Sequence, residues 1–316
     1  MEKLYLKVVS INIMDIHIGS PIEFEKILDH TFTKSVSLTR QRMSIQQLLD
    51  QKEDQPLLTQ HLEQYCRNIY DTIDQMSGST TLLQQPRFTW VIDHETCHSS
   101  CWIFEALVPS VALAQVYTQE GRNHLLLNQF KDANKSFKKA ETVFSKTTIL
   151  TKQWKWKLPH VNHKITREAW HLSQKHIMQS FQHLCLQCVG ISKASNSNTM
   201  STIATRALTS ASLSWMHWKT HEAENVIKLA DGLRYLYSSN ILWDNSHYGA
   251  SIFRLQNWLT NIEIDTGSFQ LLKEEFGKIP LLLQERINTN NGAYFDAVAA
   301  IDDLPSLEQV INKSLG

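Results

Sequence analysis

The residues best suited to chemistry in this chain lie in one short stretch, HETCHSSC, which runs from His94 to Cys101. Histidine and cysteine side chains bind zinc and carry out thiol chemistry. In a helix, His94, Cys97, His98 and Cys101 would follow i, i+3, i+4, i+7 spacing and share one face. The first and last would then stand about 10 Å apart along the axis, too far for one tetrahedral ion with donors about 2.0–2.3 Å away. We therefore expect small buried residues leading into a core helix, and no metal.

A second candidate is the segment KTTILTKQWKWKLPHVNHK, residues 146–164, in which lysines alternate with Trp154 and Trp156. This pattern suits an acidic membrane surface, but tryptophans that pack between helices and lysines in solvent explain it more simply. Between Lys131 and Lys175 there are eleven Lys or Arg and three acids. Such a bias favours an acidic partner or an anionic surface, or indicates only a solvated helix face.

Common catalytic patterns are missing elsewhere. The sequence has no G-x-S-x-G, no G-x-x-x-x-G-K-[ST] and no G-x-G-x-x-G, and only ten glycines occur in the whole chain. The adjacent carboxylates Glu274 and Glu275 would point about 100° apart on a helix, so they do not form an acid–base pair. We expect no cofactor.

Length and composition indicate an ordinary globular protein. The chain has 316 residues, of which 42% are hydrophobic and 20% charged, with no formal net charge. A chain of this size buries a sizeable core without disulfides or metals. Its five cysteines are an odd number, which does not suggest a secreted disulfide framework. Without a signal peptide or an apolar run of about 18 residues, we expect an intracellular, soluble protein.

Hydrophobic periodicity predicts a mainly α protein. Alternating residues 4–18 predict one or two short strands, and Pro21 is placed to open a helix. Residues 77–89 and the Ser/Asn-rich segment 192–201 are expected as loops, and the tail from 289 as irregular. Helices are predicted over 41–76 (interrupted near Pro56), 122–146, 166–189, 202–239, 247–261 and 268–288.

The helix over 122–146 has the clearest pattern. Its apolar positions recur at steps of three and four, as one continuous stripe does. This helix has the size of a tetratricopeptide helix, but no 34-residue repeat is in register, so the pattern favours a helical bundle or a solenoid of helix pairs. The stripe consists of Leu126, Phe130, Ala133, Phe137, Ala140 and Phe144.

Four segments in order resemble the Bro domain family. Phe88-Thr-Trp90 is followed by Phe104-Glu105 and ALVPSVALAQVYTQEG, as in the family's F-x-W and F-E motifs. LNQFKDANKSFKKAETVF is similar to its long tetratricopeptide-like helix, HYGASIFRLQNWL to its G-E-A-I-A-R-L helix, and NTNNGAYFDAVAAIDDLPSLEQ to its C-terminal segment. The matches cover most of residues 88–310. Pro109 departs from the family pattern.

The resemblance implies an ALIX-type, elongated, boomerang-shaped helical domain that spans residues 1–316. Residues 1–20 would form a short β element, 21–288 the helical body, and 289–316 an irregular segment folded back on that body. DGLRYLYSSNILW makes the chain most similar to the PalC group, which works in fungal ambient-pH (Pal/Rim) signalling. Proteins of that pathway act toward the proteolytic activation of a transcription factor.

The family resemblance also implies a function. Bro domains are adaptors, not enzymes, and bind the C-terminal amphipathic helix of the ESCRT-III core subunit in an apolar groove. TIATRAL is the counterpart of the groove helix, and lysines of the long helix would meet an acidic partner. The expected partner-binding residues are Ile203, Ala207, Leu208, Val310, Ile311, Lys135, Lys138 and Lys139.

The same resemblance implies a cytoplasmic protein, recruited peripherally to ESCRT-III at endosomal or plasma membranes, with other pH-signalling components as further partners. Nucleic acid is not an expected partner. Two alternatives stay open from the residues alone. One is a tetratricopeptide-like scaffold for another peptide. The other is a zinc or thiol site built from His94, Cys97, His98 and Cys101.

Overall fold

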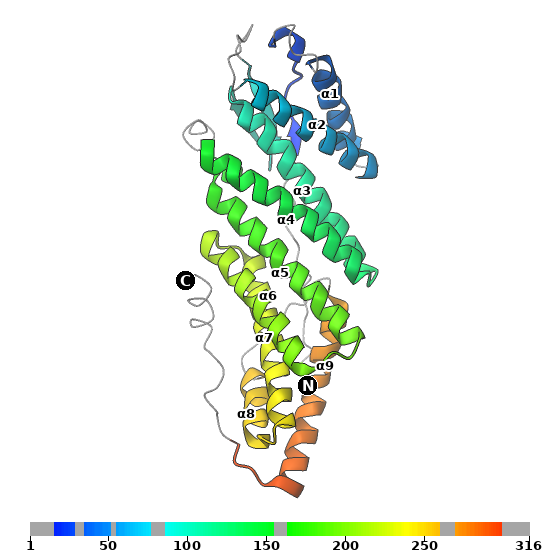
Figure 1. Cartoon of the computed structure of the whole chain (residues 1–316), viewed down its shortest axis with the longest axis vertical. Coiled ribbons are helices and arrows are strands. Elements are labelled where there is room, and N and C mark those ends of the chain that lie inside the picture. The colour runs from blue at the N-terminus through cyan, green and yellow to red at the C-terminus, as the bar shows by residue number, and fades with distance from the viewer. Residues whose placement is uncertain are drawn as a thin grey trace. The chain divides into compact units, whose positions relative to one another are not determined.

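A computed structural model describes residues 16–28, 35–51, 55–76, 86–154, 163–259 and 269–298 (Figure 1). The predicted mainly α class is confirmed, and one small antiparallel sheet is present in this part of the chain. The elements are β1 (Ile16–Ile18), α1 (Ser35–Gln51), α2 (Gln55–Met76), β2 (Phe88–Ile92), β3 (Glu95–Ser99), α3 (Trp102–Leu126), α4 (Phe130–Trp154), α5 (Glu168–Ser192), α6 (Ser197–His217), α7 (His221–Asp244), α8 (Tyr248–Leu259) and α9 (Gln270–Thr289).

These residues divide into two compact units. The sheet unit contains 16–119 and 139–175, and the C-terminal unit contains 120–138 and 176–298. The boundaries fall inside helices, so α3, α4 and α5 each contribute to both units. None of the helices in the described ranges is long and apolar enough to cross a membrane.

The sheet unit is built on an aromatic core. Phe24 lies in a short 3₁₀ turn, Phe88 begins β2, and Trp102 begins α3. The ring centres of Phe88 and Trp102 are 5.1 Å apart in an edge-to-face contact, and those of Phe24 and Trp102 are 5.7 Å apart. These rings fix the sheet, in the order β1-β2-β3, against the start of α3.

The C-terminal unit packs α6 on α7, α7 on α8 and α8 on α9. A buried arginine of α9 joins three of these helices. The Nη1 atom of Arg286 donates to Ser239 Oγ of α7 at 2.6 Å and to Ser251 Oγ of α8 at 2.8 Å. Its Nη2 atom donates to Asn240 Oδ1 at 2.7 Å. Burial lowers the pKa of Arg286 to about 10, and the cation is kept by these three acceptors.

Several predicted boundaries are wrong, each for a local reason. The helix predicted over 122–146 is two helices, because the chain turns at Asn128, whose φ is 55°. Leu126, counted in the stripe, ends α3 and is 68% exposed. Residues 126 and 130 keep helical spacing by chance across this turn, so periodicity could not reveal it. From Ala133 to Phe144 the stripe is buried, as predicted.

The helix predicted over 202–239 is likewise divided into α6 and α7. Trp218 has an extended backbone with φ −153°, and the Thr220 side chain accepts a hydrogen bond from Ala223 N, which caps α7. The expected loop 192–201 is shorter, since the Asn196 side chain caps α6 by accepting from Thr199 N. Pro21 opens no α-helix within 16–28, where only the 3₁₀ turn Phe24–Lys26 forms.

Candidate functional site

The stretch from His94 to Cys101 forms no helix, which corrects the sequence-based expectation. Asp93 and His94, with φ values of 51° and 68°, make a two-residue turn, and Glu95–Ser99 return as β3. Ile92 pairs with Glu95 across this turn. Positive φ at both central residues is typical of the type I′ turn that suits a twisted hairpin. Only Cys97 is buried among the five residues of β3, so no hydrophobic alternation could reveal the strand.

The hairpin also separates the four candidate ligands. Cys97 and His98 are neighbours on a strand, so their side chains lie on opposite faces. His98 is exposed and its Nδ1 lies 2.9 Å from Thr89 Oγ1. Residues 94–98 also spell H-E-x-x-H, the zinc-peptidase pattern. That pattern brings its two histidines to one zinc ion only when the segment is helical, which it is not here. In the ranges that the structure describes, no cluster of three His, Cys, Asp or Glu could hold a metal ion.

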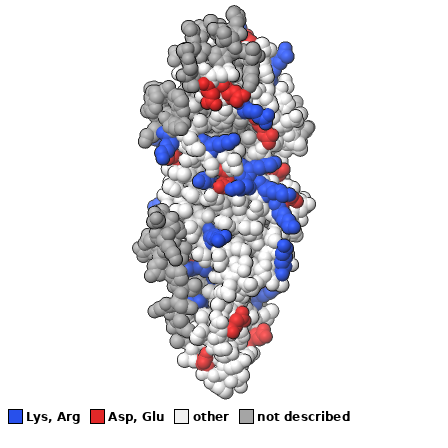
Figure 2. All heavy atoms as spheres, viewed as in Figure 1, with Lys and Arg blue, Asp and Glu red and all other residues white. Residues whose placement is uncertain are grey.

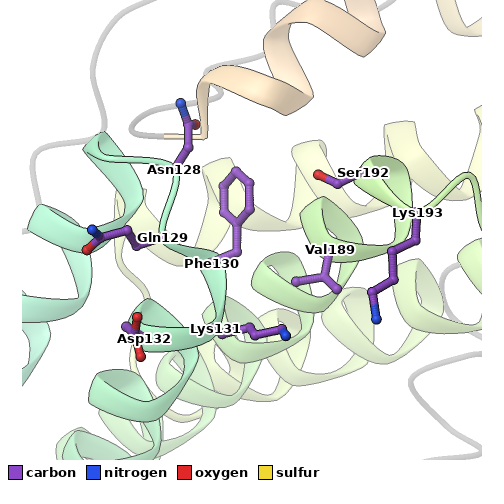
Figure 3. A pocket seen from close by; sticks show the side chains of 8 residues that line it. All are labelled: Asn128, Gln129, Phe130, Lys131, Asp132, Val189, Ser192 and Lys193. Atoms are coloured by element: carbon purple, nitrogen blue, oxygen red, sulfur yellow. The ribbon is translucent and has the colours of Figure 1, made fainter.

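A pocket of about 330 Å³ lies in the C-terminal unit, between the start of α4 and the end of α5 (Figure 3). Phe130 and Val189 form its apolar wall. Lys131 and Lys193 extend toward each other across it, while Asp132 points elsewhere. The complete lining is Asn128, Gln129, Phe130, Lys131, Asp132, Val189, Ser192 and Lys193.

The pocket is electropositive. Asp132, the acid in its lining, pairs with Lys135 at 2.8 Å, and this hydrogen bond lowers the pKa of Asp132. The side chains of Lys131 and Lys193 are exposed at the pocket. The N-terminal end of α4 adds the positive end of its helix dipole. An apolar wall with two lysines at its rim suits an acidic and an apolar side chain on one ligand.

Exposed lysines continue along α4, and Figure 2 shows Lys and Arg side chains gathered over this helix. Lys135 and Lys138 follow Lys131 at i+4 and i+7, so the three share one face of α4. This row fits a ligand that carries several acids at helical spacing.

The turn between α5 and α6 brings a second helix to the same place. Gly190 follows Val189, and a Cβ atom on Gly190 would lie 2.4 Å from Met200 Sδ of α6. A larger residue at this position would force the Met200 side chain to shift. Ser180 Oγ then donates to the carbonyl of Ala207 at 2.8 Å, which holds α6 along α5. The pocket wall and the first turns of α6 are therefore neighbours.

Ile203, a predicted contact, lies one helical turn beyond Met200 and is half-buried. On α5, Leu186 lies one turn before Val189 and is 45% exposed. Leu186 and Ile203 do not line the pocket itself, but each lies one helical turn from a residue already described, Val189 on α5 and Met200 on α6. We call the set the anchor surface; it consists of Phe130, Lys131, Leu186, Val189, Lys193 and Ile203.

The other predicted residues have different positions. Ala207 and Leu208 are completely buried in the C-terminal unit. Lys139 is exposed in the sheet unit, with its Nζ 4.9 Å from the centre of the Tyr117 ring. Val310 and Ile311 lie outside the described residues.

Sequence reasoning missed five residues of the anchor surface: Phe130, Lys131, Leu186, Val189 and Lys193. Phe130 was assigned to the buried stripe of the long helix. Val189 and Lys193 are about sixty residues further along the chain than Phe130, and only the two turns bring them together. A usable signal was present in Leu186 and Val189, which recur at i and i+3 on α5, and in Lys193, which follows the end of this helix at Ser192.

Comparison with known proteins gives a likeness in structure alone. No family model and no curated protein sequence matches the chain. A structure described as an ALIX BRO1 CHMP4C complex aligns with a TM-score of 0.72 and 13% identity, over 96% of this chain and 91% of that one. ALIX in complex with the SIVmac239 PYKEVTEDL late domain aligns at 0.70 and 12% identity, over 95% of this chain and 47% of that one.

A third structure, described as the basis for endosomal targeting by the Bro1 domain, aligns at 0.64 with 13% identity, over 98% of this chain and 96% of that one. The chain therefore has a Bro1-type helical fold, as the resemblance predicted. At these sequence identities, the likeness shows a shared fold and nothing further.

Proposed function

We propose that this protein is a non-catalytic adaptor that binds the C-terminal amphipathic helix of an ESCRT-III subunit. The anchor surface is the observation that carries the proposal. It combines apolar side chains from three helices with the exposed side chains of Lys131 and Lys193. The Bro1-type fold supports the choice of partner, since one similar structure is a complex of ALIX with CHMP4C.

The partner helix binds with its apolar side chains against Phe130, Val189 and Ile203. Its acidic side chains meet Lys131 and Lys193, and further acids meet Lys135 and Lys138 along α4. Burial of the apolar contacts supplies most of the affinity, while the lysines at the rim orient the helix and speed its association. Val310 and Ile311, which lie outside the described residues, are included in the proposal as further apolar contacts.

The experiment is a calorimetric titration of the protein with the C-terminal helix peptide of CHMP4C. We expect micromolar affinity. Ile203→Asp places a charge in the apolar contact and weakens binding by about tenfold or more, and Lys131→Glu weakens it by about fivefold. Leu208→Asp is unsuitable, because Leu208 is completely buried and the substitution would unfold α6.

Two variants serve as matched controls. Leu281→Asp changes a leucine of α9 that is 76% exposed, and Lys152→Glu changes an exposed lysine at the far end of α4. Both keep wild-type affinity. If Ile203→Asp and Lys131→Glu also bind as the wild type does, the anchor surface is not the site. If the wild type binds no peptide, the proposed function is wrong.

The remaining parts of the proposal follow from this role. The protein works in the cytoplasm as a single Bro-type domain and is recruited to ESCRT-III at endosomal or plasma membranes. It belongs to the PalC group of fungal ambient-pH signalling and meets other components of that pathway. Co-precipitation of those components from fungal cells, with Ile203→Asp as the comparison, tests this assignment.

A further inference from the structure

The turn between α6 and α7 exposes large apolar side chains that the proposed peptide site does not use. Trp215 is 37% exposed and Met216 is 47% exposed. Lys219 follows them, and its Nζ lies 4.8 Å from the centre of the Trp215 ring. His217 and His221 are also exposed. We call residues 215–221 the α6–α7 tip.

The tip is basic as well as apolar. Residues 197–221, which include all of α6, contain no Asp or Glu. Of the next acids along the chain, Glu222 has a buried Oε1 atom, and Glu224 pairs with Lys228 at 2.9 Å while its Oε2 atom lies 3.8 Å from His221 Nδ1. On α5, His176 stacks on His217 with ring centres 5.6 Å apart. No exposed carboxylate in residues 197–221 therefore opposes an anionic surface.

The geometry of the tip favours contact with a lipid layer over contact with the surface of another protein. Trp215 and Met216 are consecutive in α6, so their side chains project about 100° apart. A flat partner would cover one of them, whereas a lipid layer surrounds both when the end of the helix enters it. Tryptophan and lysine together are also the usual residues at the level of lipid headgroups.

We propose that the α6–α7 tip inserts into the headgroup layer of a membrane that carries anionic lipids. Trp215 and Met216 enter the layer, and Lys219 binds lipid phosphates or carboxylates. The turn is firmly held for this task, because Trp218 N donates to Ser214 O at 3.0 Å and Thr220 caps α7. This surface is separate from the anchor surface and does not depend on ESCRT-III binding.

The test is co-sedimentation of the full chain with vesicles of phosphatidylcholine alone, or with one fifth phosphatidylserine, in the absence of any peptide. We expect binding to the anionic vesicles that weakens as salt is raised. Trp215→Ala combined with Met216→Ala weakens it about tenfold, and Lys219→Glu about fivefold. Leu281→Ala, at an exposed leucine of α9, leaves it unchanged.

Met216→Asp is a second variant at the exposed position, and circular dichroism verifies that each variant is folded. No vesicle binding by the wild type, or equal binding by all the variants, overturns the proposal. Vesicle binding that persists in the double variant while CHMP4C peptide binding is lost would show that the tip is a protein contact, which also overturns it. Loss of peptide binding in Ile203→Asp has no bearing on this result.

Discussion

At the scale of single residues, Glu105 is a buried carboxylate on which several elements of the sheet unit depend. Its carboxylate is completely buried in α3 and accepts three hydrogen bonds. Arg42 Nε donates at 2.8 Å, Trp90 Nε1 at 2.7 Å, and the Tyr65 hydroxyl also donates. The donors come from α1, β2 and α2, so one side chain connects three elements to α3.

We expect Glu105→Gln to lower the free energy of unfolding by about 3 kcal/mol or more, because it leaves the Arg42 cation buried without its counter-charge. Urea denaturation measures the change. Glu95→Gln, at an exposed glutamate of β3, is the matched control and changes stability by less than about 0.5 kcal/mol. Equal stability of Glu105→Gln and the wild type would contradict the assigned role.

At the scale of elements, the turn between α5 and α6 depends on close contact at Gly190. The absent side chain lets Met200 pack against the α5 backbone. Gly277, inside α9, has no atom within 4 Å of an added Cβ, so it offers the same substitution in open space.

Gly190→Ala should lower the free energy of unfolding by about 1 kcal/mol, because the buried Met200 side chain must shift to make room for the methyl group. It should also weaken CHMP4C peptide binding, since Lys193 and Ile203 lie on either side of this contact. Gly277→Ala should instead raise stability by up to about 1 kcal/mol, because alanine favours the helix. Urea denaturation of both variants decides the matter; a gain in both would show that α5 and α6 tolerate the extra methyl group.

A comparison of the observed elements with those expected from apolar spacing shows which parts of the fold could be predicted from the sequence. Apolar spacing identifies α2, the middle of α4, α5, α8 and α9, because long amphipathic helices repeat their pattern over several turns. It misses the hairpin, where β3 buries only Cys97, and it misses the turn at Asn128. Around the candidate site, Ile203, Lys135 and Lys138 were predicted as contacts, but Lys131 and the other residues of the pocket were not. Val189 reaches Phe130 only through tertiary packing, which no local pattern encodes.

At the scale of the whole molecule, two buried titratable groups have opposite effects on how stability changes with pH. Burial lowers the pKa of His171 in the sheet unit to about 4 from 6.5, and it raises the pKa of Glu222 in the C-terminal unit to about 7 from 4.5. Below pH 6.5 the unfolded chain protonates at position 171 while the folded chain does not, so stability falls as pH falls. Below pH 7 the folded chain protonates Glu222 before the unfolded chain does, so stability rises as pH falls.

These effects offset each other between about pH 4.5 and 6.5. We expect His171→Gln to make the protein more stable at pH 5 relative to pH 7 than the wild type is, by about 2 kcal/mol. Glu222→Gln should change the pH dependence in the opposite direction. Urea denaturation at both pH values measures the difference, and His247→Gln, at an exposed histidine, should behave as the wild type. Parallel pH dependence in all four proteins would contradict this account.

The unit boundaries inside α3, α4 and α5 have a consequence for how such a protein can arise or be divided. The chain passes from one unit to the other within each of these helices, after residues 119, 138 and 175. No single cut of the gene therefore encodes either unit complete, and a truncation at any of these points severs a helix in its interior. Exchange of modules between genes would transfer residues 16–298 as one piece.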